Sequence, residues 1–345
     1  MLSGLPAFRP VRMPSASAPP PPSSLPPVPA VTLQAIGAAA APTADTLATI
    51  GFGAPQGDAA DPRRLQVPLL ADRAMLEVWS ARGPGVHGRD GGIAWASDGA
   101  LLFGAIEIDE AAAGGIEAAT AEAYARLLPH LRRQGCPHLL RIWNYLDAIT
   151  EGDGDDERYR RFCVGRVRGL GGVDTAALPA ATAIGRCDGV RTLLVYWLAA
   201  RAPGIPLENP RQTAAWRYPR RYGPQSPSFA RALLAPEPLG LPLLLSGTAA
   251  IVGHASLHPD SLAAQLDETL ANLQAVIAAA RRHRPALAPG FGTGTQLKVY
   301  VRDREAMDEV AALLDARLPA EVRRLLLHGH VCRRELRVEI EGVHA

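Results

Sequence analysis

Residues 241–345 alternate strand-like and helix-like segments in an order that leaves few possible folds. Strand patterns at Leu243–Leu245 and Ala249–Ala255 precede a helix pattern over Asp260–Arg282, in which leucines recur on one stripe. A strand, a helix and two closing strands follow, at Leu297–Arg302, Arg304–Leu318, Val322–Leu327 and Leu336–Glu341. The order β-β-α-β-α-β predicts one dominant sheet with both helices on a single face, so that other parts of the chain must cover the opposite face.

The middle of the chain shows a similar, weaker order of segments. Strand patterns at Ile93–Ala96 and Leu101–Ile108 precede an alanine-rich helix that starts at Ile116 and is expected to stop near Pro129. A buried strand, a charged helix and a central strand follow, at His138–Tyr145, Asp156–Val167 and Arg191–Ala199. We therefore predict an α+β chain of two related units that face each other, each a mixed β-sheet with helices packed on one face.

Composition divides the chain into four parts. Ten of the first thirty residues are proline, and such a stretch cannot bury enough apolar surface to offset its ordering entropy. We expect a Pro/Ala-rich flexible N-terminal segment (1–60), an N-terminal α+β domain (61–200), an arginine-rich connection (201–240) and a C-terminal domain (241–345).

Charge and cysteine content exclude several partners. The formal net charge of +2 is too small to hold nucleic acid or an anionic membrane, and no apolar run approaches the length of a membrane span. The four cysteines are widely spaced, at Cys136, Cys163, Cys187 and Cys332. This spacing favours reduced thiols, and with no apolar signal segment at the start it predicts a cytoplasmic protein.

The connection is rich in arginine and lacks acidic residues. Between Glu208 and Glu237 it contains five arginines and no carboxylate. Guanidinium groups bind carboxylates or phosphates two oxygens at a time, and the nearby Tyr218, Tyr222 and Trp216 offer hydroxyl donors and flat faces. The segment predicts a site for a small, multiply anionic molecule with a ring.

Two glutamates near the C-terminus share one face of a predicted strand. In LRVEIEG, apolar residues alternate with charged ones, so Glu339 and Glu341 lie two positions apart on the same side. One buried carboxylate raises the pKa of the other, which is how a carboxyl group is kept protonated near neutral pH. The alternation alone favours a charged, solvent-exposed outer strand face over a buried pair.

Several motifs resemble known families. SGTAAIVGHAS and the helix after it resemble the RidA (YjgF) fold, except that Pro319-Ala320-Glu321 stands where those proteins usually read Pro-Ala-Arg. Larger pieces resemble the chorismatases, a family built on that fold. These pieces are LLRIWNYLDAI (139–149), ERYRRFCVGR (157–166), LPAATAIG (178–185), ENPRQTAAWRYPRRYGPQSPSFARA (208–232), SGTAAIVGHAS (246–256) and ELRVEIEG (335–342).

The chorismatase resemblance implies an enzyme that cleaves chorismate to pyruvate and a ring product with no cofactor. It implies that Glu339 is the acid that protonates the enolpyruvyl methylene group. It also implies that Cys332 marks the type that forms 3-hydroxybenzoate, some members of which also form the 4-isomer. The expected substrate-binding residues are Arg166, Tyr218, Arg220, Tyr222, Arg231, Gly247 and Thr248.

Three other interpretations stay open. A RidA-like deaminase of imines is disfavoured by Glu321 in the arginine position, and a non-catalytic module would bind the metabolite without turnover. A zinc site on one strand face at His328, His330 and Cys332 is disfavoured because no fourth ligand is apparent, so we expect no metal. The protein is expected to be a monomer or a small homo-oligomer.

Overall fold

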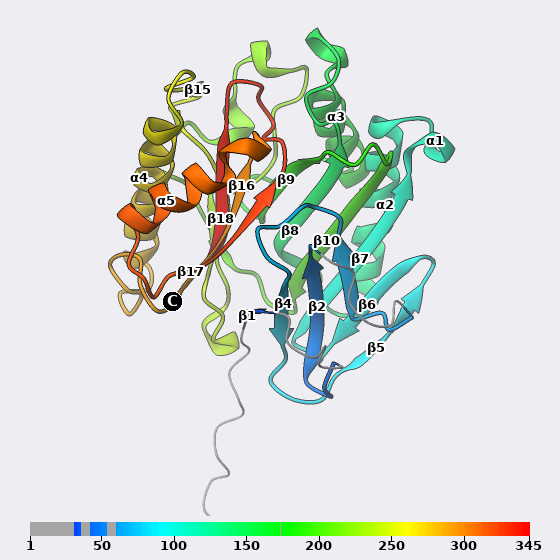
Figure 1. The fold of residues 1–345 in the computed structure, drawn as a ribbon. Coiled ribbons are helices and arrows are strands. Elements are labelled where there is room, and N and C mark those ends of the chain that lie inside the picture. The colour runs from blue at the N-terminus through cyan, green and yellow to red at the C-terminus, as the bar shows by residue number, and fades with distance from the viewer. Residues whose placement is uncertain (1–30, 36–41, 54–59, 173) are drawn as a thin grey trace, which may run out of the picture.

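The computed structural model describes residues 31–35, 42–53, 60–172 and 174–345, and its main body consists of two similar units. Each unit contains a six-stranded sheet, and Figure 1 shows the two sheets side by side with their helices on the outer sides. The first sheet has the order β5 (Val86–Asp90), β6 (Ile93–Ser97), β7 (Leu101–Asp109), β10 (Thr192–Ala200), β8 (His138–Asp147) and β9 (Ala180–Arg186). The second has the order β11 (Ile205–Leu207), β12 (Ala232–Leu234), β13 (Leu243–Thr248), β18 (Val338–His344), β16 (Thr295–Val301) and β17 (Arg323–His328).

The two sheets have the same topology. In each, the central strands pair antiparallel, and the last two strands of the order pair in parallel, β8 with β9 and β16 with β17. A helix lies between the two strands of each parallel pair, because parallel neighbours need a long crossover connection. The prediction of two related α+β units is therefore confirmed.

The helices lie on one face of each sheet. On the first sheet these are α2 (Ile116–Arg133) and α3 (Arg158–Leu170), next to the single turn α1 (Glu110–Ala113); on the second they are α4 (Leu262–Arg281) and α5 (Met307–Arg317). Each helical layer has its own apolar core. In the second unit, Leu266, Leu273 and Ile277 of α4 are completely buried against the sheet, as the leucine stripe predicts.

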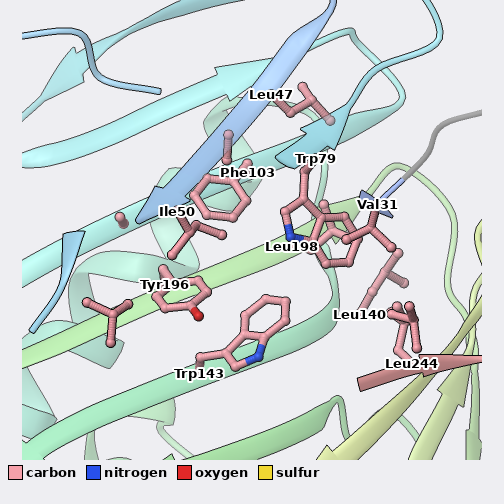
Figure 2. Close-up of a cluster of buried hydrophobic side chains, with 14 of the residues drawn as sticks. Val31, Leu47, Ile50, Trp79, Phe103, Leu140, Trp143, Tyr196, Leu198 and Leu244 are labelled. Atoms are coloured by element: carbon pink, nitrogen blue, oxygen red, sulfur yellow. The ribbon is translucent and has the colours of Figure 1, made fainter. Parts of the chain in front are cut away.

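A third apolar core covers the open faces of both sheets. It is closed by a four-stranded sheet with the order β1 (Val31–Ala35), β4 (Met75–Ser80), β2 (Thr46–Phe52) and β3 (Arg64–Val67). Figure 2 shows Ile50 and Trp79 of this small sheet packed with Tyr196 and Trp143 of the first unit and with Leu244 of the second. The covering that the helix placement requires is thus supplied from the N-terminal part of the chain.

Part of the expected flexible segment is folded. Every residue of Thr46–Phe52 is buried, and Val31–Ala35 forms the edge of the same sheet. The run TLATIGF consists of β-branched, apolar and small residues and fits a strand buried on both faces, whereas the surrounding proline and alanine obscure it in an averaged composition. Residues 1–30 of the predicted tail lie outside the described residues.

Two predicted boundaries are wrong. Helix α2 passes through Pro129 and continues to Arg133, because Leu127 and Leu131 on either side are completely buried and this burial outweighs the lost hydrogen bond. The expected strand Ala249–Ala255 is a small hairpin, β14 (Ile251–Val252) and β15 (Ala255–Ser256), which turns at Gly253 with φ +56°. The connection 201–240 is irregular only in its middle, where short 3-10 turns lie, because β11 and β12 at either side of this part are strands of the second sheet.

We predict that Gly165→Ala destabilises the protein although alanine is the better helix former. Gly165 of α3 lies against the backbone carbonyl of Glu117 in α2, and a Cβ atom there would collide with that oxygen. Overpacking costs about 1–3 kcal/mol, which exceeds the gain of about 1 kcal/mol in helix propensity. Urea unfolding should show the loss.

The matched control is Gly290→Ala, because a Cβ atom at Gly290 would meet nothing within 4 Å. Its unfolding midpoint should stay close to that of the wild-type protein. Equal midpoints for both variants would show that the contact between α2 and α3 adjusts to a methyl group.

Candidate active site

A cavity of about 300 Å³ lies where the two units meet. Its wall combines α3 and β9 of the first unit with the arginine-rich connection, β13 and the segment 332–339 of the second. The volume is in the range of small-molecule sites, which begins at about 300 Å³. The cavity can therefore hold one ligand of the size of a substituted ring.

Glu339 on β18 lies on the wall of this cavity. It is only 6% exposed, and it faces Gly247 of β13. A Cβ atom at Gly247 would collide with Oε1 of Glu339, so only glycine leaves room for the carboxyl group in this position. The glycine thus makes space for the acid as well as for a ligand.

The environment of Glu339 favours its protonated form. Burial raises its pKa to about 8, and the negative charge of Glu341 acts in the same direction. The guanidinium groups of Arg141, Arg231 and Arg302 oppose this shift without cancelling it. Near neutral pH, Glu339 is consequently a carboxylic acid that can donate a proton into the cavity.

Glu341, two residues further along β18, is held in the opposite state. Burial alone would raise its pKa, but Lys298 and Arg141 and the hydroxyl groups of Thr182 and Tyr300 hold it below its usual value. The Thr182 and Tyr300 hydroxyls each donate to its carboxylate at 2.5 Å, Lys298 Nζ lies at 3.0 Å, and Arg141 Nη2 forms an ion pair with it. Glu341 is therefore a buried carboxylate whose charge is compensated.

The compensation extends into the small N-terminal sheet. Lys298 Nζ also lies 2.7 Å from Glu77 Oε2, and Glu77 Oε1 accepts a hydrogen bond of 2.6 Å from Trp79 Nε1. Burial disfavours the charged form of Lys298, but Glu341 and Glu77 together raise its pKa above the usual value. Four alternating charges thus run from Glu77 through Lys298 and Glu341 to Arg141.

The cavity wall also carries buried arginines without carboxylate partners. Arg166 and Arg231 are 5% and 3% exposed, and neither forms an ion pair within the described part of the chain. Their Nε atoms have no hydrogen-bond partner there. Arg231 donates to the hydroxyl of Tyr218 at 2.8 Å, and Arg333 stacks on the ring of Tyr222 at 4.1 Å. Such unpaired guanidinium groups make the cavity attractive to an anion.

The structure brings most of the predicted site residues together. The predicted residues that line the cavity are Arg166, Tyr218, Tyr222, Arg231, Gly247, Cys332 and Glu339. Thr248 is buried next to the cavity, where its hydroxyl donates to the Ser246 carbonyl at 3.0 Å. Arg220 is directed away from it.

Arg220 lies on the surface and pairs with an acid that the sequence analysis did not consider. Its guanidinium is 65% exposed and contacts both carboxylate oxygens of Asp155, at 2.9 and 2.5 Å. The 3-10 turn Arg220–Tyr222 points successive side chains in different directions, so that Arg221 and Tyr222 reach the cavity while Arg220 does not. Arg333, from the segment that follows β17, also lines the cavity and supplies a cation that the sequence did not indicate.

Cys332 lines the cavity as a neutral thiol. Burial raises its pKa to about 12, and the nearby Glu339 acts in the same direction. Its chemistry in the cavity is thus that of a small, weakly polar side chain and not that of a thiolate nucleophile.

Arg141, Thr182 and Lys298 are functional neighbours that sequence reasoning missed. Arg141 stands in the otherwise apolar strand HLLRIWNYLD, and Lys298 in LKVYV. A single charge within an apolar strand signals a buried partner. The sequence did not indicate that Arg141 and Lys298 both pair with the same carboxylate, that of Glu341.

Comparisons with known proteins agree with this site. A family model described as "Chorismatase FkbO/Hyg5-like, N-terminal" matches residues 77–199. A chorismatase from Streptomyces hygroscopicus is 42% identical over 280 residues, which cover 79% of this chain and 80% of that protein. A 3-hydroxybenzoate synthase from the same species is 33% identical and covers 81% and 84%. A crystal structure of a chorismatase superposes with a TM-score of 0.81 at 38% identity, covering 92% of this chain and 98% of that one.

We predict that the stability of the wild-type protein falls relative to Glu339→Gln as pH rises from 4.5 to about 8. In this window the folded state holds a proton on Glu339 that the unfolded state has released, so each rise in pH favours unfolding. Glutamine has no such proton, and the variant should be more stable at alkaline pH by up to a few kcal/mol, an order of magnitude set by the shift.

Urea unfolding of both proteins at acidic, neutral and alkaline pH measures this difference. Glu321→Gln, at an exposed position outside the cavity, should follow the wild-type protein at every pH. A constant difference between Glu339→Gln and wild type across the window would mean that Glu339 ionises like a glutamate in water.

Proposed function

The chain belongs to the chorismatase family, and we propose that it converts chorismate to pyruvate and 3-hydroxybenzoate. The observation that carries this proposal is the protonated Glu339 beside buried arginines that lack carboxylate partners. Chorismate is a cyclohexadiene with two carboxylates, one on the ring and one on an enolpyruvyl ether. An enzyme that cleaves it therefore needs cations that bind the carboxylates and an acid that can protonate the methylene carbon of the enol ether.

Binding begins with the arginines. We assign Arg166 and Arg231 to the two carboxylates, with Arg333 and the hydroxyl of Tyr218 as further donors. Each of these arginines is held from behind, Arg166 over the ring of Tyr124 at 5.2 Å and Arg231 by the carbonyl of Thr213 at 2.9 Å. Guanidinium groups held in fixed positions orient the substrate so that its vinyl group lies next to the carboxyl group of Glu339.

Chemistry begins with proton transfer from the carboxyl group of Glu339 to the terminal methylene carbon of the enol ether. The ether then becomes an oxocarbenium centre, which water or the substrate's own hydroxyl captures before pyruvate leaves. Chorismate contains the same atoms as pyruvate and hydroxybenzoate together, so any water added is lost again when the ring becomes aromatic. The proton that the capturing water or hydroxyl gives up restores the proton of Glu339. When the ring becomes aromatic, the ring proton leaves with hydroxide as water or, after capture by the substrate's own hydroxyl, passes to the phenolic oxygen.

The fixed charge of Glu341 supports this cycle. Its carboxylate stays ionised, since four groups compensate it, and it keeps the pKa of Glu339 high without competing for the proton. After proton transfer, the Glu339 carboxylate lies beside a cationic intermediate, which its negative charge stabilises. An acid with a pKa of about 8 is well matched to proton transfer near neutral pH.

The imine deaminase alternative has less support. Glu321, which stands in the arginine position of the RidA motif, is exposed and does not line the cavity. We also propose a cytoplasmic location, because Cys136, Cys163, Cys187 and Cys332 are all free thiols.

Glu339→Gln should lower the rate of pyruvate release from chorismate by roughly 10²–10⁴-fold, the usual contribution of a general acid. Chorismate binding, measured by calorimetry, should persist because the arginines are unchanged. Glu321→Gln is the control and should keep wild-type turnover. Near-full activity of Glu339→Gln would remove the acid assignment, and tight binding by the wild-type protein with no pyruvate would identify a non-catalytic binding module.

Cys332→Ala should keep pyruvate release but change the ring product. The thiol is a neutral part of the cavity wall, and replacing it leaves more room beside the ring for water to capture the intermediate. Chromatography of the products should show less 3-hydroxybenzoate and more dihydroxylated cyclohexadiene, with the 4-isomer measured in the same run. Cys136→Ala, outside the cavity, should give the wild-type product ratio. An unchanged ratio for Cys332→Ala would show that this thiol does not select the product.

A further inference from the structure

A second group of reactive side chains lies outside the cavity, where the two units pair with each other. The chain that leaves β17 forms an isolated bridge with β9, in which Gly185 and His330 exchange backbone hydrogen bonds of 2.8 and 2.9 Å. Cys187 follows β9 directly, and His328 is the last residue of β17. The bridge therefore brings side chains of the two units together.

These side chains are Cys187, His328 and His330. Their potential ligand atoms, one from each residue, all lie within 4.8 Å of one another. The sequence grouped His328 and His330 with Cys332 on one strand face, but β17 ends at His328 and Cys332 turns into the cavity. Cys187, from the other unit, takes the place of that cysteine.

The donor set suits a zinc-like ion. Zinc is bound by thiolate sulfur at about 2.3 Å and by imidazole nitrogen at about 2.0 Å, which places tetrahedral ligand atoms roughly 3.3–3.7 Å apart. The distances between the ligand atoms must shorten by up to about 1 Å to reach this spacing, and rotation of the side chains supplies this shift. Oxygen-seeking cations such as magnesium and calcium do not favour this set.

The imidazole ring of His328 is oriented for binding a metal ion. His328 Nε2 lies 3.1 Å from the backbone carbonyl of Arg302, so its proton is held there and Nδ1 keeps a free lone pair. Cysteine binds a metal as the thiolate, so the Cys187 thiol releases its proton when the metal binds.

We propose that Cys187, His328 and His330 bind one zinc-like divalent metal ion across the junction of the two units, with a fourth position for water. Such an ion links the end of β9 to the end of β17 and stabilises the folded state, because the unfolded chain does not hold the three ligands together. The site is distinct from the cavity and does not depend on the proposed activity.

The site is coupled to the cavity wall through Arg302. The carbonyl of Arg302 fixes His328, while its guanidinium donates to the carbonyls of Val331, Arg333 and Leu336 at 2.5, 2.7 and 2.8 Å. The segment that carries Cys332 and Arg333 is thus held by the same residue that orients one metal ligand. A bound metal ion would therefore help to fix the backbone of this segment through Arg302, although the ion itself lies outside the cavity.

Zinc titration of the metal-free, full-length protein by calorimetry tests the proposal. We expect one tight site per chain, a higher melting temperature with zinc, and a thiolate-to-metal charge-transfer band when cobalt(II) replaces zinc. Cys187→Ser should lose that band, and both Cys187→Ser and His330→Gln should bind zinc at least tenfold more weakly, a loss typical of disturbed metal ligands. His283→Gln, an exposed histidine outside the cluster, is the matched control and should bind as wild type.

The proposal fails if zinc affinity is the same in wild type, Cys187→Ser and His330→Gln, since binding would then reside on scattered histidines. It also fails if cobalt binds without a thiolate band. Melting temperatures of the metal-free variants separate loss of the site from loss of the fold: a variant that melts like metal-free wild type but no longer gains stability from zinc supports the site.

Discussion

The ion pair between Glu341 and Arg141 is the interaction on which the rest of the site depends. It joins residues 200 positions apart, and both side chains are almost completely buried. A buried charge without a partner costs several kcal/mol, so neither residue can keep its position unless the two units assemble around both. Lys298 and Glu77 extend the pairing into the small N-terminal sheet. The network thus requires all three sheets at once.

The same network explains how two glutamates on one strand face hold different charges. Glu341 receives an arginine, a lysine and two hydroxyl groups, and these hold its pKa low in spite of burial. Glu339 is 6% exposed and faces the cavity, and burial together with the charge of Glu341 raises its pKa to about 8. The groups around each glutamate, and not its position on the strand, decide which of the two stays protonated.

Local patterns explain how much of this could be predicted. Alternation in LRVEIEG placed both glutamates on one face, and the leucine stripe of α4 and the order of elements predicted the two units. The arginine-rich segment predicted the anionic ligand, but composition cannot say which guanidinium turns inward. Asp155, far away in sequence, holds Arg220 on the surface, while Arg333, from the segment that follows β17, lines the cavity.

Contacts between the units explain the rest. Arg141 and Lys298 each look like an isolated charge in an apolar strand, and only the facing of two sheets shows that they share Glu341. The bridge between Gly185 and His330 likewise decides that Cys187, and not Cys332, meets the two histidines. Nothing in the local sequence encodes such pairings across units.

The shared topology of the units raises the question of why the acid belongs to the second. Strand β10 occupies in the first sheet the place that β18 occupies in the second. On its open face β10 carries Leu194, Tyr196 and Leu198, which are buried in the central core, where β18 carries Glu339 and Glu341. An acid in the first unit would need its own compensating cations, and the core there is filled by stacked aromatic rings, with Trp143 and Tyr196 4.7 Å apart. The first unit therefore contributes Arg141 and Thr182, which compensate Glu341, and Arg166, which lines the cavity. This asymmetry makes the site depend on both units.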